Sequence, residues 1–166
     1  MHLRKQRLRS VLTGLCCLVG LARPAHAVQP QIAVITARSG PHLALDRNTL
    51  RNIYLKKIFV DQDRLKLNPV NLPTGSPLRD AFVQSIIHMP DAQLQDYWDR
   101  EYFQGVSPPY VLGSQDAVVR FVAETPGAIG YVALCHVDAT VHIALLIALP
   151  TRVVDDISGC LDHAAH

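Results

Sequence analysis

Three residues in the middle of the chain, Thr74, Gly75 and Ser76, have the types that could hold an anion. They follow an extended, proline-marked stretch and come directly before a predicted helix with Pro77 in its first turn. A helix start has free backbone N–H groups and the positive end of the helix dipole. A glycine lets a ligand approach the backbone, and the hydroxyls add donors. The pattern predicts an oxyanion site or, more simply, a helix that Ser76 caps and that binds nothing.

A second group with similar chemistry follows the first predicted strand. Residues 36–40 read TARSG and combine two hydroxyls, a guanidinium and a glycine. Ligands of α/β proteins bind at the ends of strands. Thr36, Ser39 and Gly40 are therefore further candidates for oxyanion binding, and the alternative is a plain surface turn.

Catalytic patterns are absent from the sequence. It contains no G-x-S-x-G and no H-E-x-x-H, and its histidines are scattered. A metal centre needs three or four ligands, and no such spacing occurs. We therefore predict a protein that is not an enzyme and that holds neither a metal nor a cofactor.

The N-terminal residues 1–27 have the three parts of a secretory signal peptide. A basic start precedes an apolar run of 11 residues, and Ala25-His26-Ala27 forms a small-x-small cleavage site. The run is too short to span a membrane, which takes about 20 residues. We expect export to the periplasm, with Val28 as the mature N-terminus. The remaining 11 basic and 14 acidic residues give a net charge of −3, which argues against nucleic-acid binding.

Two cysteines remain after the predicted cleavage, Cys135 and Cys160. In an exported chain they could form one disulfide that ties the C-terminal tail to the domain. The alternative is two unpaired cysteines.

The predicted elements that must position these groups alternate between strands and helices. Asp46, Asp91 and Ser114 are the predicted N-caps of three helices, and the predicted helix at Ser76 is the fourth. Strands or extended segments are predicted over residues 31–37, 67–73, 127–134 and 141–149. The order predicts an α/β domain with a mixed sheet covered by helices, over residues 28–150, followed by a tail at 151–166.

Two apolar features are predicted to be internal. The last strand is apolar on both faces, which favours a place inside the sheet. The aromatic residues Tyr97, Trp98, Tyr102 and Phe103 are interpreted as core packing rather than as a platform for stacking sugars.

Four blocks in order resemble the phosphate-binding proteins of bacterial phosphate ABC transporters, and above all their short, single-lobe relatives. They are residues 45–57 (LDRNTLRNIYLKK), residues 68–82 (NPVNLPTGSPLRDAF), the pair Tyr97-Trp98, and residues 125–132 (TPGAIGYV). The similarity runs over residues 32–149. It implies a single lobe of the periplasmic-binding-protein-like fold, type II. It also implies an exported solute-binding role, usually for phosphate held by hydroxyls and helix-start N–H groups, and delivery to an ABC permease.

The chain departs from that family at the anion loop, which resembles Arg-x-Asp-Gly-Ser-Gly-Thr. Gly75 and Ser76 match, but Leu72 and Thr74 stand at the arginine and aspartate positions. Residues 77 and 78 replace the final Gly-Thr, and a proline has no N–H to donate. Arg79, three residues into the helix, could partly replace the lost arginine.

Two functions stay open from the sequence. The first is a binding module for phosphate or a similar oxyanion, with weak affinity because one lobe leaves the anion in water; dimerisation could supply the missing wall. The second is a ligand-free interaction module that partners a membrane sensor or transporter.

Overall fold

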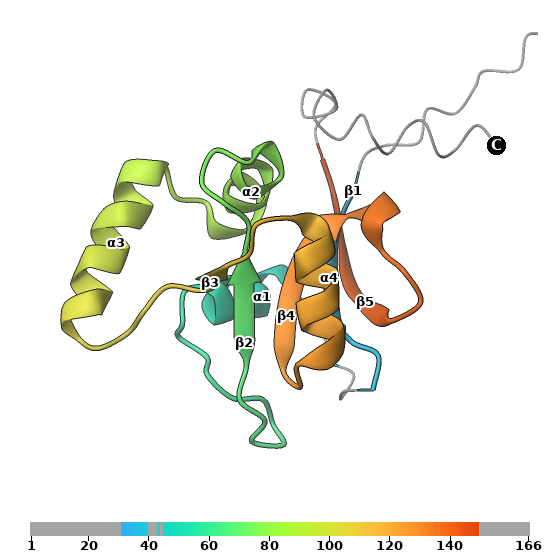
Figure 1. Cartoon of the computed structure of the whole chain (residues 1–166). Coiled ribbons are helices and arrows are strands. Elements are labelled where there is room, and N and C mark those ends of the chain that lie inside the picture. The colour runs from blue at the N-terminus through green and yellow to red at the C-terminus, as the bar shows by residue number, and fades with distance from the viewer. Residues whose placement is uncertain (1–30, 40–42, 44, 150–166) are drawn as a thin grey trace, which may run out of the picture.

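A five-stranded mixed sheet with helices packed against it makes up the described part of the chain. The structure, a computed structural model, describes residues 31–39, 43 and 45–149. The predicted signal peptide, Gly40, Cys160 and the predicted tail lie outside the described residues. In Figure 1, α4 lies in front of the sheet and α1 lies behind it.

The sheet has the order β3-β2-β4-β1-β5. β2 runs parallel to both β3 and β4, whereas β1 runs antiparallel to β4 and β5. The mixed α/β sheet is therefore confirmed. Its strands are β1 (Gln31–Ala37), β2 (Asn68–Asn71), β3 (Tyr110–Val111), β4 (Ala128–Ala133) and β5 (Val141–Ala148).

Among the described strands β5 forms an edge of the sheet, so the predicted interior position of the last strand is wrong. Its side chains are mostly half-buried or exposed, and Leu146 is 44% exposed. In β5 the apolar run therefore indicated neither covered faces nor two hydrogen-bonded neighbours. β1 pairs with both β4 and β5 and lies between them.

The helices largely start where the capping residues predict. Asp46 accepts from the Thr49 amide at 2.7 Å, and Ser114 accepts from the Ala117 amide at 3.1 Å. Asp91 is not a cap, because Pro90 has the extended backbone of the N-cap position and Asp91 is the first helical residue. The helical segments are α1 (Arg47–Tyr54), α2 (Pro77–Phe82), the π-helix η1 (Val83–Ile87), α3 (Asp91–Phe103), α4 (Gln115–Glu124) and the 3₁₀ turn η2 (Leu134–His136).

Three buried aromatic rings join the helices to the sheet. The rings of Phe82 and Tyr131 stack at 3.9 Å between centroids with an interplanar angle of 3°. Tyr54 packs against both, at 4.7 Å and 5.9 Å. Its hydroxyl donates to the carbonyl oxygens of Val70 at 2.9 Å and Ile129 at 3.3 Å. The cluster therefore fixes α1 and α2 against β2 and β4.

Helix α3 projects away from the sheet (Figure 1), and none of its residues is buried. Leu94 and Tyr97 lie partly buried against the core. The prediction of core packing is wrong for Tyr102 and Phe103, which are 68% and 89% exposed. These two residues lie in the last turn of the helix, beyond the part that contacts the core. Within the described part of the chain, every helix is too short or too polar to cross a membrane.

Candidate functional site

The loop that carries Thr74, Gly75 and Ser76 lies where the fold favours ligands. β2, β3 and β4 are parallel, so their carboxyl ends lie at the same end of the sheet. At this end of the sheet the loop follows β2 and leads into α2. The segment that follows β3 starts at the same end and leads into α4. Binding sites of α/β proteins form at the carboxyl ends of the strands.

The loop is a tight turn that requires glycine. The Ser76 amide donates to the Pro73 carbonyl oxygen at 3.1 Å, which closes a four-residue turn. Gly75, its third residue, has φ +80°, the left-handed value that such a turn needs and that glycine adopts without strain. A Cβ at Gly75 would have no atom within 4 Å. The backbone at Gly75 is therefore open to solvent and not covered by other segments.

The helix start leaves amide hydrogens outside the helical pattern. The first helical bond runs from the Asp80 amide to the Ser76 carbonyl oxygen at 3.0 Å. The amides of Leu78 and Arg79 precede it, and Pro77 has none. Ser76 occupies the N-cap position, but its side chain makes no capping hydrogen bond. The simpler interpretation, in which the Ser76 hydroxyl caps the helix, therefore lacks its defining contact.

Arg79 folds back over the loop. Its Nη1 donates to the Leu72 carbonyl oxygen at 2.9 Å and to Thr74 Oγ1 at 3.1 Å. The guanidinium thus brings a positive charge beside the turn, and part of its donor capacity holds the turn in place. Leu72, at the position of the family's arginine, is buried and only 2% exposed.

Replacing Arg79 with Ala is expected to lower the free energy of unfolding by about 1–2 kcal/mol, because two hydrogen bonds from a charged donor are lost at a half-exposed site. Urea titration followed by circular dichroism measures the loss. Arg79→Lys keeps the charge but not the planar group, and should recover only part of it. A wild-type urea midpoint in Arg79→Ala would contradict the clamping role.

A polar pair, the buried Tyr131 and the half-buried Asn71, lies next to the start of the loop. The Tyr131 hydroxyl donates to Asn71 Oδ1 at 2.5 Å and accepts from the Leu72 amide at 3.4 Å. Burial raises the pKa of Tyr131 far above its usual value, so this hydroxyl stays protonated and neutral. Sequence reasoning missed the pair. The tyrosine within the GAIGYV strand was its one visible signal.

The second predicted corner lies at the other end of the sheet. Thr36 pairs with Ile129 at the beginning of β4, while the Gly75 loop follows the end of β2, which is parallel to β4. Thr36 is buried, and its Oγ1 has no hydrogen-bond partner among the described residues; Ser39 is exposed. The structure therefore does not bring Thr36 and Ser39 together with Gly75. A ligand-binding role for them, and for Gly40, stays a separate prediction.

Further predicted residues can be placed only in part. Cys135 lies in η2 and is exposed, but its predicted disulfide partner is not among the described residues. In the described ranges, no three His, Cys, Asp or Glu side chains gather as a metal site would require.

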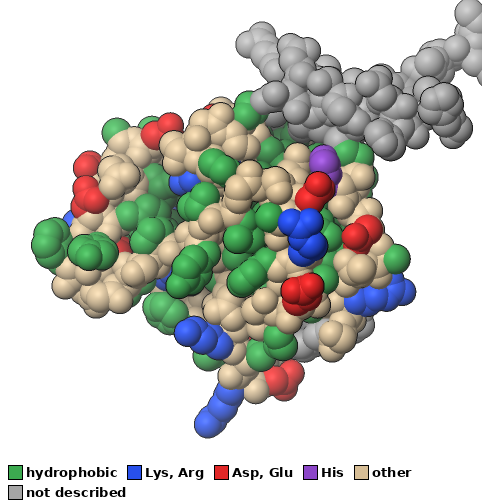
Figure 2. Space-filling model, in the orientation of Figure 1, with side chains coloured by type: hydrophobic (Ala, Val, Ile, Leu, Met, Phe, Trp, Pro, Cys, Tyr) green, Lys and Arg blue, Asp and Glu red, His purple; other side chains and the backbone are tan. Residues whose placement is uncertain are grey.

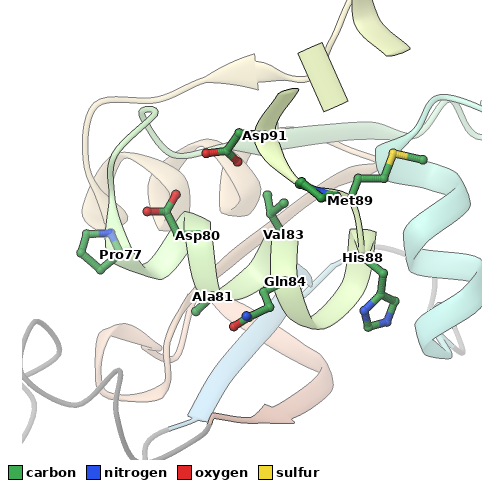
Figure 3. Close-up of a pocket in the computed structure, with 9 residues that line it drawn as sticks. Pro77, Asp80, Ala81, Val83, Gln84, His88, Met89 and Asp91 are labelled. Carbon is green, nitrogen blue, oxygen red and sulfur yellow. The ribbon is translucent and has the colours of Figure 1, made fainter. Parts of the chain in front are cut away.

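A hollow of about 720 Å³ lies beside α2 and the start of α3 (Figure 3). Pro77, Ala81 and Met89 supply apolar lining, and the carboxylates of Asp80 and Asp91 lie on one side of it. Two carboxylates repel an anion, so this hollow is a poor oxyanion site despite its size. The exposed Gly75 loop is the better candidate, because there Asp80 is the single acidic residue of the first helical turn and the Arg79 guanidinium lies beside the loop.

Comparison with solved structures shows which proteins have a similar fold. An ABC-type phosphate transport receptor from Vibrio cholerae matches with a TM-score of 0.55 and 19% identity, over 69% of this chain and 45% of the receptor. A protein from Clostridium perfringens, described as a phosphate ABC transporter substrate-binding protein with bound phosphate, matches with a TM-score of 0.58 and 21% identity, over 78% of this chain and 53% of that protein. The chain thus has the fold of such binding proteins and spans about half of their length. No protein-family profile matches it, and neither does any curated protein.

Proposed function

We propose that this chain is an exported solute-binding module that holds phosphate or a similar small oxyanion for an ABC transport system. The observation that carries the proposal is the uncovered turn at Gly75, which precedes a helix start with free amides. Such a helix start is a ready anion site. The solved neighbour with bound phosphate supports the choice of ligand.

The proposed site is open and should bind weakly. One lobe leaves a bound anion in contact with water, where charge interactions are several-fold weaker than in a closed cleft. The Arg79 guanidinium lies beside the turn and adds a positive charge, although two of its hydrogen bonds go to the loop itself. We expect a dissociation constant on the order of micromolar to millimolar.

A second candidate is a ligand-free interaction module that partners a membrane sensor or transporter. Leu72 stands buried where the related loops have arginine, and Pro77 removes one donor from the helix start. These two features weaken the anion site and favour a chain that uses its surface to contact another protein.

Titration calorimetry with phosphate distinguishes the two, and Gly75 offers a matched pair of variants. Asp and Asn tolerate a positive φ better than other side chains, and they have almost the same shape. Gly75→Asp places a negative charge in the turn and should abolish binding. Gly75→Asn places a neutral group there and should keep most of it.

The same titration on Ser76→Ala tests whether the Ser76 hydroxyl binds phosphate. We expect the affinity to fall roughly tenfold, because one hydrogen bond to a charged group is lost. Absence of heat at millimolar phosphate in the unmodified protein would favour the interaction module. Equal binding by Gly75→Asp and Gly75→Asn would remove this turn as the site.

A further inference from the structure

Helix α3 is held to the rest of the chain through a small part of its surface. Leu94, Tyr97, Trp98 and Glu101 are half-buried, and none of its 13 residues is buried. The shorter helix α1 buries three of its 8 residues. Figure 2 shows the α3 segment as a projection from the molecule with acidic side chains on its outer side. Helices in proteins owe most of their stability to the apolar face that they pack on a core, so α3 gains less from the core than α1 does.

The attachment of α3 to the core combines one hydrogen bond with a narrow apolar contact. The Tyr97 hydroxyl donates to the Leu55 carbonyl oxygen at 2.6 Å. Burial raises the pKa of Tyr97, so this hydroxyl keeps its proton at neutral pH and can donate. Leu94, Trp98 and Phe82 line a common crevice of about 10 Å³, where the apolar side of α3 faces the core. A few half-buried side chains and this hydrogen bond therefore hold the helix in place.

Left-handed backbone occurs at both ends of the α3 segment. His88, before the helix, has φ 54° and ψ 40°, and Gly105, after it, has φ 80°. Outside these two residues the chain is fixed again by backbone hydrogen bonds. The His88 amide donates to the Val83 carbonyl oxygen at 2.9 Å, and the Leu112 amide donates to that of residue 71 at 2.8 Å. Residues at the ends of an element are the usual hinges of moving segments, because they absorb the change in φ and ψ.

We propose that residues 89–109, which we call the arm, open away from the core as one unit while the sheet and the other helices stay folded. Segments with few buried contacts open at a lower free energy than the whole domain. Opening breaks the hydrogen bond between Tyr97 and Leu55 and uncovers one side of Phe82. Phe82 keeps its stacking on Tyr131 when the arm leaves, so the aromatic cluster of the core does not depend on the arm. This inference is independent of phosphate binding.

Native-state hydrogen exchange of the full chain, followed by NMR at low urea concentrations, tests the proposal. We expect the α3 amides to exchange at least about 100-fold faster than those of β1 and β4, because the arm opens more often than the sheet unfolds. The α3 amides should also share one urea dependence, since a single opening exposes a single amount of surface. Amides of α3 that exchange as slowly as those of β1 overturn the proposal. So do rates that rise toward the helix ends without a urea dependence, because they indicate fraying.

Tyr97→Phe removes the hydrogen bond to Leu55 and keeps the ring. Exchange in α3 should become roughly five- to tenfold faster, while exchange in β1 and β4 stays unchanged. Tyr102→Phe is the matched control, because it removes the same hydroxyl from the same helix at a side chain that is 68% exposed. It should leave both sets of rates unchanged. Equal acceleration of the α3 and β1 amides in Tyr97→Phe would show that the arm and the core open together, which overturns the proposal.

Discussion

Replacing Phe82 with Ala is expected to lower the free energy of unfolding by about 4 kcal/mol. The ring is 1% exposed, stacks on Tyr131 at 3.9 Å and contacts Tyr54 at 4.7 Å. Its removal leaves a cavity where α2 packs on the sheet, and two aromatic neighbours lose their partner. Because α2 begins at the Gly75 turn, the same change should loosen the candidate site.

Urea unfolding followed by tryptophan fluorescence measures the loss. Phe82→Leu is the matched control, because it keeps most of the volume and should cost less than about 1.5 kcal/mol. If Phe82→Ala and Phe82→Leu unfold at the same urea concentration, the aromatic cluster does not hold α2 in place.

Replacing Gly130 with Ala is expected to cost about 2–3 kcal/mol, from a single added methyl group. A Cβ at this position would lie 2.4 Å from Val118 Cγ1 and 3.0 Å from Val122 Cγ2. Both valines belong to α4, which packs directly on β4, and both are buried. The methyl group must therefore push the helix away from the sheet, since protein interiors have no spare volume.

Thermal unfolding of Gly130→Ala should show a midpoint lowered by several degrees. Gly113→Ala is the control, because a Cβ at Gly113 meets no atom within 4 Å. That variant should unfold within about one degree of the unmodified protein. A loss in Gly113→Ala as large as that in Gly130→Ala would show that the cost does not come from the close approach of α4.

The local patterns of the sequence predicted most of the elements. The β-branched run of β1 and the capping residues Asp46 and Ser114 lie where the predictions placed them, because these signals depend on near neighbours in the chain. The glycine inside β4 indicated a close approach, and the atoms that approach it are valine side chains, two of them from α4, rather than backbone.

The features that the sequence did not predict depend on distant parts of the chain. β3 has only two residues and no pattern of its own, and its pairing with β2 defines it as a strand. The exposure of Tyr102 and Phe103 depends on where α3 leaves the core, which helical spacing does not encode.

The candidate site was predicted in part. Gly75 and Ser76 could be predicted from their residue types and from their position before a helix. The clamp by Arg79 and the hydroxyl of Tyr131 next to the loop required the fold, because Tyr131 is 59 residues away from Leu72 in sequence. Thr36 belonged to a second predicted corner, and the register places it at the opposite end of the sheet from Gly75, so its predicted role remains separate from this site.

The placement of β1 between β4 and β5 has a consequence for how the chain acquires its fold. Of the described strands β1 is the first in sequence, yet it pairs with the last two, so its contacts close loops of about a hundred residues. Such distant pairings form late, after most of the chain is available. During synthesis the emerging polypeptide therefore holds β1 without either of its sheet partners until β4, about a hundred residues later, has left the ribosome.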